Sequence, residues 1–174
     1  SALTGHLVFS TLHTNNAAGT IPRLIDLGVN AKIISSALTL SIAQRLVRKL
    51  CPFCKTEVPL QAAEKEQLAV ILASIKKKRP SFIGPPLEKI WSPGKCAKCN
   101  NTGYKGREGI FEAIVMDDKI AAATIGNPNE REIRTAAIPQ GILDMRQDGV
   151  LKVLEGSTSL RELSRVIDLY EEII

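Results

Sequence analysis

The sequence predicts an α/β fold with additional helices. Hydrophobic residues make up 44% and charged residues 24% of its 174 residues, which is typical of a packed globular chain. Aromatic residues are only 4%, so Leu, Ile, Val and Ala must fill most of the core, as they do in helix-rich domains. A short β-branched, apolar run at residues 6–13 is typical of a buried strand. This length suits one ordinary domain or two small ones.

The first expected element is this strand, which ends in polar residues. His13-Thr-Asn-Asn16 then turns the chain. Ligands of open α/β sheets bind beyond the carboxyl ends of the strands, so His13 and Thr11 are candidates for contact with a ligand. His6 is the only other histidine and lies at the start of the run. A hydrogen-bonded core histidine is the alternative for both.

Two helices are expected next. The first would have Thr20 as its cap, Pro22 in its first turn and Gly28 as its left-handed ending residue. Residues 31–50 then carry apolar residues at spacings of three and four, with basic residues in the last turns, which predicts one long and mostly buried helix. Its charged and polar interruptions argue against a membrane span.

The second half of the chain alternates loops with regular elements. Residues 61–78 predict a more exposed helix, residues 79–86 are rich in Pro and Gly, and residues 110–116 predict a strand. Two or three short helices are expected to close the chain. Their capping-box pairs and terminating glycines are Asn129 with Glu132, Ser159 with Glu162, Gly141 and Gly156.

All four cysteines occur in two Cys-x-x-Cys pairs, Cys51 with Cys54 and Cys96 with Cys99. This spacing lets both sulfurs of a pair reach one zinc ion, and four protein ligands leave no open position, so the site would be structural. The alternative is two disulfides or four buried thiols without a metal. No secretory signal is visible, so a reducing compartment is expected, and disulfides are rare there. A redox Cys-x-x-Cys also remains open.

The charge balance allows one rival interpretation, and docking of the zinc module to another protein is a second. The formal net charge of +5 and the pI of about 9.1 suit an acidic partner, and residues 76–79 form a basic run. That run has no interleaved aromatic residues to stack on bases, and four thiolates with one zinc ion would lower the charge to about +3 (+5 − 4 + 2). We therefore expect no nucleic-acid partner. A zinc-ribbon nucleic-acid-binding module and an adaptor module remain the alternatives.

Several longer segments resemble one family. The run Leu3-Thr-Gly-His-Leu-Val-Phe-Ser-Thr-Leu-His-Thr-Asn15 resembles the histidine box of the secretion ATPase superfamily. The cysteine pairs resemble its zinc-bearing branch, the type II secretion and type IV pilus-assembly ATPases. The other segments that carry the resemblance are Arg23–Gly28, Gln44–Cys54, Cys96–Glu112, Gly141–Gly156 and Ser159–Asp168.

This resemblance implies a hexameric, magnesium-dependent ATPase of RecA-like fold. Such a protein would drive pilus or pseudopilus extension as a homo-hexamer at the cytoplasmic face of the inner membrane. Its partners would be an inner-membrane platform protein and the cytoplasmic domain of a secretion or pilus-assembly protein. The implied cofactors are structural Zn2+, and ATP with Mg2+ in the full-length protein.

The resemblance also implies roles for residues. His13 would approach the nucleotide phosphates with Thr11 and Thr14 nearby, and His6 belongs to the same box. Arg45 and Arg48 could line the nucleotide or a subunit boundary. The alternative for both arginines is a helix-terminal cation that interacts with the helix dipole and solvent.

The expected architecture is a partial RecA-like P-loop NTPase domain, then a mostly helical carboxy-terminal extension with a four-cysteine zinc-binding module. Residues 1–50 would form the end of the ATPase domain, and residues 51–112 the zinc module with a helical insertion. Residues 113–174 would form a helical subdomain. No Gly-x-x-x-x-Gly-Lys-Ser/Thr motif occurs. The sequence lacks an initial Met and a strand-like run follows Thr4 at once, so we expect that upstream residues are missing. Because the phosphate-binding loop is absent, we also expect no ATP hydrolysis by the chain alone.

Overall fold

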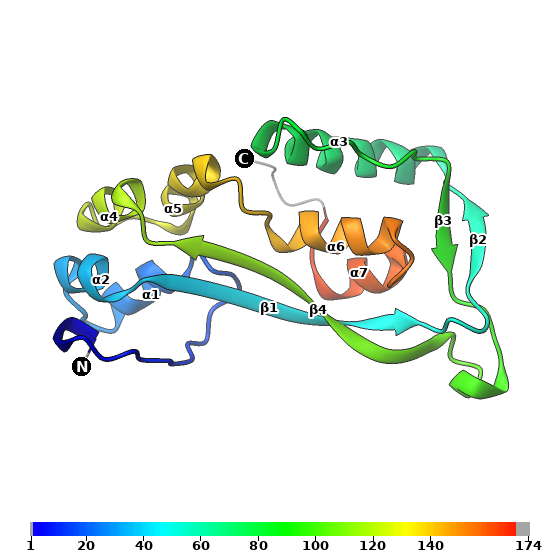
Figure 1. Cartoon of the computed structure of the whole chain (residues 1–174), viewed down its shortest axis with the longest axis horizontal. Helices are drawn as coiled ribbons and strands as arrows, with labels where there is room; N and C mark the ends of the chain where they lie inside the picture. Colours follow the sequence, from blue (N-terminus) through cyan, green and yellow to red (C-terminus); the bar gives the residue numbers. More distant parts are fainter. Residues whose placement is uncertain (1, 170–174) are drawn as a thin grey trace. The chain divides into compact units, whose positions relative to one another are not determined.

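A computed structural model describes residues 2–169 as a mixture of helices and strands. These residues divide into two compact units, the first formed by residues 2–43 and 112–142 and the second by residues 44–111 and 143–169. Two long paired strands, β1 (Leu40–Leu50) and β4 (Tyr104–Val115), contribute to both units (Figure 1). No described helix is long and apolar enough to cross a membrane.

The first unit is a small helical cluster with the ends of β1 and β4. Its helices are η1 (Ala2–Thr4), α1 (Thr20–Asp26), α2 (Ala31–Ala37), α4 (Asp118–Ile125), α5 (Glu130–Ala137) and η3 (Ile138–Gln140). In Figure 1 the blue α1 and α2 lie beside the yellow-green α4 and yellow α5. Ile21 and Ile34 pack with Ile120 and Ile133 in one buried cluster. Distant segments of sequence therefore share this core.

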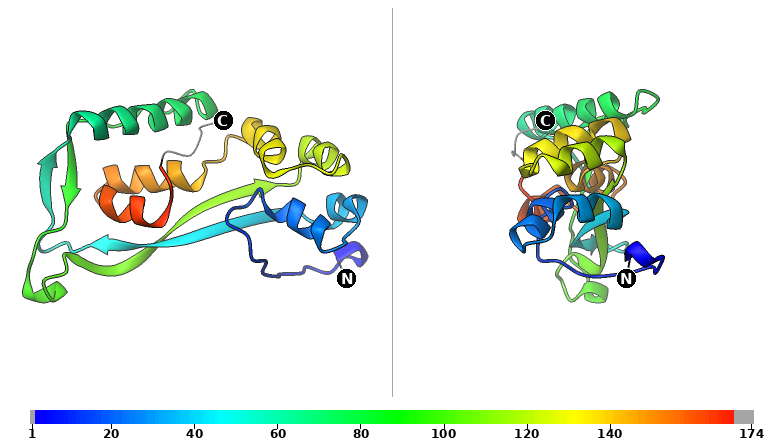
Figure 2. Two further views of the ribbon diagram at one scale, coloured as in Figure 1. Left: turned by 180° about the vertical axis from the view of Figure 1, so that it is seen from behind. Right: turned by 90° about the vertical axis from the view of Figure 1, so that its left-hand side faces the viewer.

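The second unit combines a two-stranded ribbon with three α-helices. Its elements besides β1 and β4 are β2 (Thr56–Pro59), α3 (Ala62–Lys78), β3 (Lys89–Ser92), η2 (Ala97–Cys99), α6 (Met145–Leu154) and α7 (Leu160–Val166). Strands β2 and β3 are antiparallel, with Thr56 opposite Ser92. Helix α3 packs on α6 and α6 on α7, the green, orange and red helices of Figure 2. A Cβ at Gly149 would lie 2.4 Å from Leu163, so α6 and α7 approach closely.

Most local signals predicted their helices correctly. The helix expected at residues 61–78 is α3, which Gln61 and Glu64 close with a capping box. The pair Asn129 and Glu132 caps α5 in the same way, and Gly28 has the left-handed φ of +83°. One cap was wrong, because Gly19 rather than Thr20 is the N-cap of α1. Between residue 116 and residue 169, where the description ends, the structure has four α-helices rather than two or three.

The long helix predicted for residues 31–50 is wrong. Helix α2 ends at Ala37, where Leu38 turns to an extended ψ of 122°, and strand β1 follows. The N–H of Met116 donates to the C=O of Thr39 and that of Cys51 to the C=O of Gly103, so β1 and β4 run antiparallel between these bonds. Pairing with a strand some 60 residues away decides this conformation, which a local apolar period does not reveal.

The strand predicted for residues 6–13 is also absent from the described structure. These residues have no regular secondary structure, and Leu7 and Phe9 are 84% and 89% exposed. A strand forms when neighbouring backbone completes its hydrogen bonds, and no described residue pairs with this segment. The segment has the composition of a strand, but no described strand lies beside it to complete its hydrogen bonds.

Candidate metal centre and histidine segment

The four cysteines converge on one point in the second unit. Their Sγ atoms all lie within 4.8 Å of one another, although the two pairs are 41 residues apart in sequence. The Sγ–Sγ distances are 3.8 Å for Cys51 with Cys96, 3.8 Å for Cys54 with Cys99 and 3.6 Å for Cys96 with Cys99. A tetrahedral zinc ion with Zn–S bonds of about 2.3 Å needs sulfurs about 3.8 Å apart. Three of the six sulfur–sulfur distances therefore match the spacing that zinc requires, and the four cysteines could hold a metal ion.

The same distances exclude the disulfide alternative. A disulfide joins two sulfurs at about 2.05 Å, whereas all four cysteines here are free thiols. Cys51 and Cys99 are buried, and Cys54 and Cys96 are half-buried. The cluster is thus partly sheltered from solvent and offers four soft ligands without an open position for water.

Glycines allow the two cysteine turns to approach each other. A Cβ at Gly94 would lie 1.9 Å from the backbone oxygen of Cys54, a distance that no side chain permits. Gly103 has a φ of +78°, and its N–H donates to the Sγ of Cys99 at 3.3 Å. Its C=O accepts from the N–H of Cys51, so this one residue ties the two turns together. Asn100 ends η2 in the left-handed conformation.

Hydrogen bonding makes the thiols unequal. Burial raises the pKa of Cys54 to about 12, and hydrogen bonds with the other three cysteines add to the rise. Burial acts in the same direction on Cys99, but hydrogen bonds with the backbone of Gly103 and of Cys96 outweigh it and lower its pKa to about 6. Thiolate is the form that binds a metal, and a coordinating thiol is deprotonated outright.

The residues predicted to approach the nucleotide lie on residues 6–14, before α1 in the first unit, which we call the histidine segment. His6, Thr11 and His13 are exposed, and Thr14 is half-buried. The hydroxyl of Thr4 pairs with Nδ1 of His6 at 3.2 Å. All of them except Thr14 are thus open to solvent along one extended stretch.

The segment becomes anchored immediately after these residues. Asn16, Ala17 and Ala18 are buried. The side-chain NH2 of Asn16 donates to Oε1 of Glu130 at 2.7 Å, and the N–H of Ala17 donates to the carboxylate of Glu112. Sequence reasoning alone did not single out these anchoring residues. Glu112 closes one of the motifs that carry the family resemblance, which is the only signal that could have pointed to it.

The two candidate arginines are on β1 in the second unit and not at the end of a helix. Arg45 is exposed. Arg48 pairs with Glu162 at 2.6 Å and lies 4.3 Å from the ring centroid of Tyr104. The dipole interaction that was the alternative for both is therefore wrong, because β1 has replaced the helix.

Glu162 is the buried centre of this charged cluster. Burial alone would raise the pKa of its carboxyl, but hydrogen bonds from Arg165 and Arg48 outweigh burial and lower it to about 2. The side chain of Glu162 is 0% exposed, whereas those of Arg48 and Arg165 are 45% and 61% exposed. A buried carboxylate is thus held by two arginines that reach solvent, which is a structural use of Arg48.

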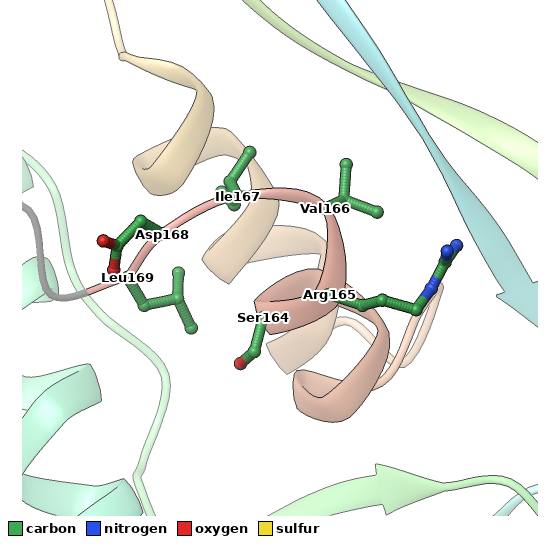
Figure 3. Close-up of a pocket in the computed structure, with 6 residues that line it drawn as sticks. All are labelled: Ser164, Arg165, Val166, Ile167, Asp168 and Leu169. Carbon is green, nitrogen blue, oxygen red and sulfur yellow. The ribbon is translucent and has the colours of Figure 1, made fainter.

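A shallow pocket lies at the end of α7 (Figure 3). The close-up shows Arg165 at one end and Asp168 with Leu169 at the other, along one continuous segment. Among residues 2–169, which the structure describes, the lining consists of residues 164–169 of this one segment. It therefore does not gather groups from separate parts of the fold, as a catalytic site would.

Comparison with known families decides the identity of the chain. The family model of the type II/IV secretion system proteins matches residues 1–165, which include the histidine segment and all four cysteines. The chain belongs to this family.

Relatives of the chain in this family are secretion and pilus proteins. Type II secretion system protein E of Aeromonas hydrophila is 41% identical over 166 residues, which are 95% of this chain and 30% of that protein. The type IV pilus assembly ATPase TfpB of Acinetobacter baylyi is 41% identical over 169 residues, 97% of this chain and 27% of that protein. For the type IV pilus assembly ATPase PilB of Thermus thermophilus the identity is 40%, over 97% of this chain and 18% of that protein. The chain thus spans less than a third of the length of these relatives.

Proposed function

We propose that the chain is the carboxy-terminal part of an ATPase that powers type IV pilus assembly or type II protein secretion. The observation that carries this proposal is its 40–41% identity to members of both groups over at least 95% of its length. The longer protein would be a homo-hexamer with a RecA-like nucleotide domain, located at the cytoplasmic face of the inner membrane. It would act on an inner-membrane platform protein and on the cytoplasmic domain of a secretion or pilus-assembly protein.

The four cysteines hold a structural Zn2+ in this proposal. Sulfur separations of 3.6–3.8 Å support it, because they match the edges of a zinc–thiolate tetrahedron. When bound, the ion would tie the turn after β1 to the turn around η2. Metal analysis by mass spectrometry should find about one zinc per chain, and Cys51→Ser should reduce it sharply. Purified protein without metal, with four freely titrating thiols, would contradict this assignment.

The histidine segment faces the nucleotide in this proposal. His13 would lie near the phosphates, with Thr11 and Thr14 beside it and His6 further along the box, and ATP with Mg2+ would be held mainly by the remainder of the longer protein. The exposure of His13 supports this, because a neighbouring part of that protein could reach it. Arg45 could contribute to the nucleotide or to a subunit boundary. Arg48 would do so only at the expense of its pair with buried Glu162.

The chain by itself should not hydrolyse ATP, because its sequence has no phosphate-binding loop and positioning is most of what phosphoryl transfer requires. The test compares phosphate release by the 174-residue chain and by the full-length ATPase that contains it, each with and without His13→Ala. We expect turnover only in the full-length protein and a large loss with His13→Ala. Turnover by the chain above its own His13→Ala control would contradict the proposal.

A further inference from the structure

We propose that Glu112 and Glu130 are positioning residues for the nucleotide-facing segment. They hold Asn16 and Ala17, and so fix where His13 and Thr14 leave the core of the first unit. This inference rests on the proposed function, because it gives the histidine segment a defined place beside the phosphates. Neither carboxylate is assigned a contact with the nucleotide, whose negative charge would repel them.

The chain passes from exposed to buried within three residues. His13 is exposed, Thr14 is half-buried, and Asn16 is only 8% exposed. Asn16 follows His13 by three positions, which span at most about 11 Å. The groups that bind Asn16 and Ala17 consequently determine the direction in which the histidine segment leaves the core.

Glu130 holds the side chain of Asn16. The Asn16 amide donates to Oε1 of Glu130 at 2.7 Å, while its own oxygen accepts from the N–H of Gly19 at 2.9 Å. Arg134 also donates to Oε1 of Glu130 at 2.7 Å and fixes that carboxylate on α5. The orientation of Asn16 is therefore determined from both ends of its amide group.

Glu112 holds the backbone of Ala17. The N–H of Ala17 donates to the Glu112 carboxylate on β4, and its C=O accepts from the hydroxyl of Ser41 on β1 at 3.1 Å. Ser41 is in turn paired with the hydroxyl of Thr20 at 2.7 Å. Side chains from two strands thus bind both polar groups of one residue.

The neighbourhood of Gly19 brings Thr14 into the same arrangement. A Cβ at Gly19 would lie 3.4 Å from Oε2 of Glu130 and 3.7 Å from Cβ of Thr14. Thr14 and Glu130 thus both lie close to Gly19, whose N–H donates to the side-chain oxygen of Asn16. Losing either carboxylate should let this segment shift, and a misplacement of about 1 Å can reduce a reaction rate about 100-fold.

The test uses the full-length ATPase that contains this chain. Glu112→Ala and Glu130→Ala should each lower kcat about 10- to 100-fold while the KM for ATP changes less than about twofold. Glu112→Gln and Glu130→Gln keep an oxygen that can accept the same hydrogen bond, and should restore kcat to within about threefold of the original protein. Glu155→Ala, which removes an exposed carboxyl of the second unit, is the matched control.

A second measurement uses the 174-residue chain. Because it has only two histidines, the imidazole signals of His6 and His13 can be followed separately by NMR. The His13 signal should shift or sharpen in the Ala variants, and the His6 signal should not. Thermal melting separates this effect from a loss of folding.

Three outcomes would overturn the inference. If His13→Ala abolishes turnover but both Ala variants retain kcat, the carboxylates do not position the segment and the proposed function stands. If His13→Ala leaves turnover unchanged, the role assigned to His13 fails and this inference fails with it. Gln variants as impaired as the Ala variants would also overturn it, because the hydrogen bond would not be the cause.

Discussion

The metal centre and the histidine segment lie in different units and differ in how they are held. At the metal centre two turns that are distant in sequence converge, and the four Sγ atoms lie within 4.8 Å of one another. In the histidine segment Leu7 and Phe9 are more than four-fifths exposed, and no described strand pairs with it. Both regions carry equally clear sequence motifs.

The difference shows that a sequence motif can indicate which residues bind a ligand without determining the secondary structure of the segment that carries them. Four soft ligands and a few permissive glycines are sufficient for the cysteine cluster, and the chain supplies them all. A strand also needs hydrogen-bonding neighbours, which residues 6–13 do not find among the described residues. We therefore expect perturbations of the metal centre to unfold structure, and perturbations of the histidine segment to leave it in place.

Chelation should have the largest effect. Removing the zinc ion proposed for the four cysteines should lower the melting temperature of the second unit strongly, because structural zinc sites contribute on the order of 10 kcal/mol. Hydrogen exchange should accelerate at the amides of Cys51 and Gly103, which bind within the cluster. The amide of Ala17 in the first unit is the internal control and should keep its protection. Equal melting with and without chelator would break the comparison.

The same substitution in each region should give unequal effects. At Gly94 the Cβ of Gly94→Ala would meet the Cys54 backbone oxygen at 1.9 Å, so the cysteine turns must separate at a cost of about 3 kcal/mol or more. At Gly5 the φ is +88° but no atom lies within 4 Å, so Gly5→Ala should cost only about 1 kcal/mol from its conformation. Urea unfolding measures both. Gly106→Ala, with a φ of +83° in open space, is the control within the second unit.

Glu162→Ala should destabilise the second unit by about 3 kcal/mol. It removes a buried carboxylate that accepts from Arg48 and Arg165, and breaking such a cluster is costly. Arg165→Ala should cost under about 1 kcal/mol, because that side chain is 61% exposed. Denaturant unfolding of both variants, with Glu155→Ala as control, checks this order. A larger loss for Arg165→Ala than for Glu162→Ala would contradict it.

Acid should remove the same stabilisation gradually. The pKa of Glu162 is lowered from an ordinary 4.5 to about 2, so the folded state binds this proton less readily than the unfolded state. Its contribution is complete above about pH 4.5 and is lost as the pH falls towards 2. With the arginines partly exposed, we expect a loss of about 2 kcal/mol. Unfolding at pH 6, 4 and 3 should show the difference between the original chain and Glu162→Gln shrinking, and a constant difference would refute it.

Local chemistry explains what could be predicted from the sequence. Caps such as Asn129 act within one helical turn, and the spacing of the cysteine pairs alone predicts that they could share a metal ion. Mixed helix and strand content and the second-unit helix α3 followed from composition and local pattern. The RecA-like architecture and the nucleotide roles of Thr11, Thr14 and His13 stay predictions.

Long-range pairing explains what could not be predicted. Strand β1 has apolar residues at helical spacings, yet it pairs with β4, and Val47 and Leu50 are buried while Ile42 and Leu46 are exposed. The bond from Ala17 to Glu112 joins residues 95 positions apart, and neither residue has a local sign of it. Arg48 likewise has its partner 114 positions away.

The smallest effect is expected at an apolar residue of the histidine segment. Phe9→Ser should change the free energy of unfolding of this chain by less than about 0.5 kcal/mol, because the ring is 89% exposed and buries little surface. Ile110→Ser on β4 is the matched control, since Ile110 is 0% exposed and its loss should cost several times more. If Phe9→Ser instead destabilised the chain by more than about 1 kcal/mol, the histidine segment would be packed in solution. The histidine segment and the metal centre would then differ only in how strongly they pack, because both would be held by other residues of this chain.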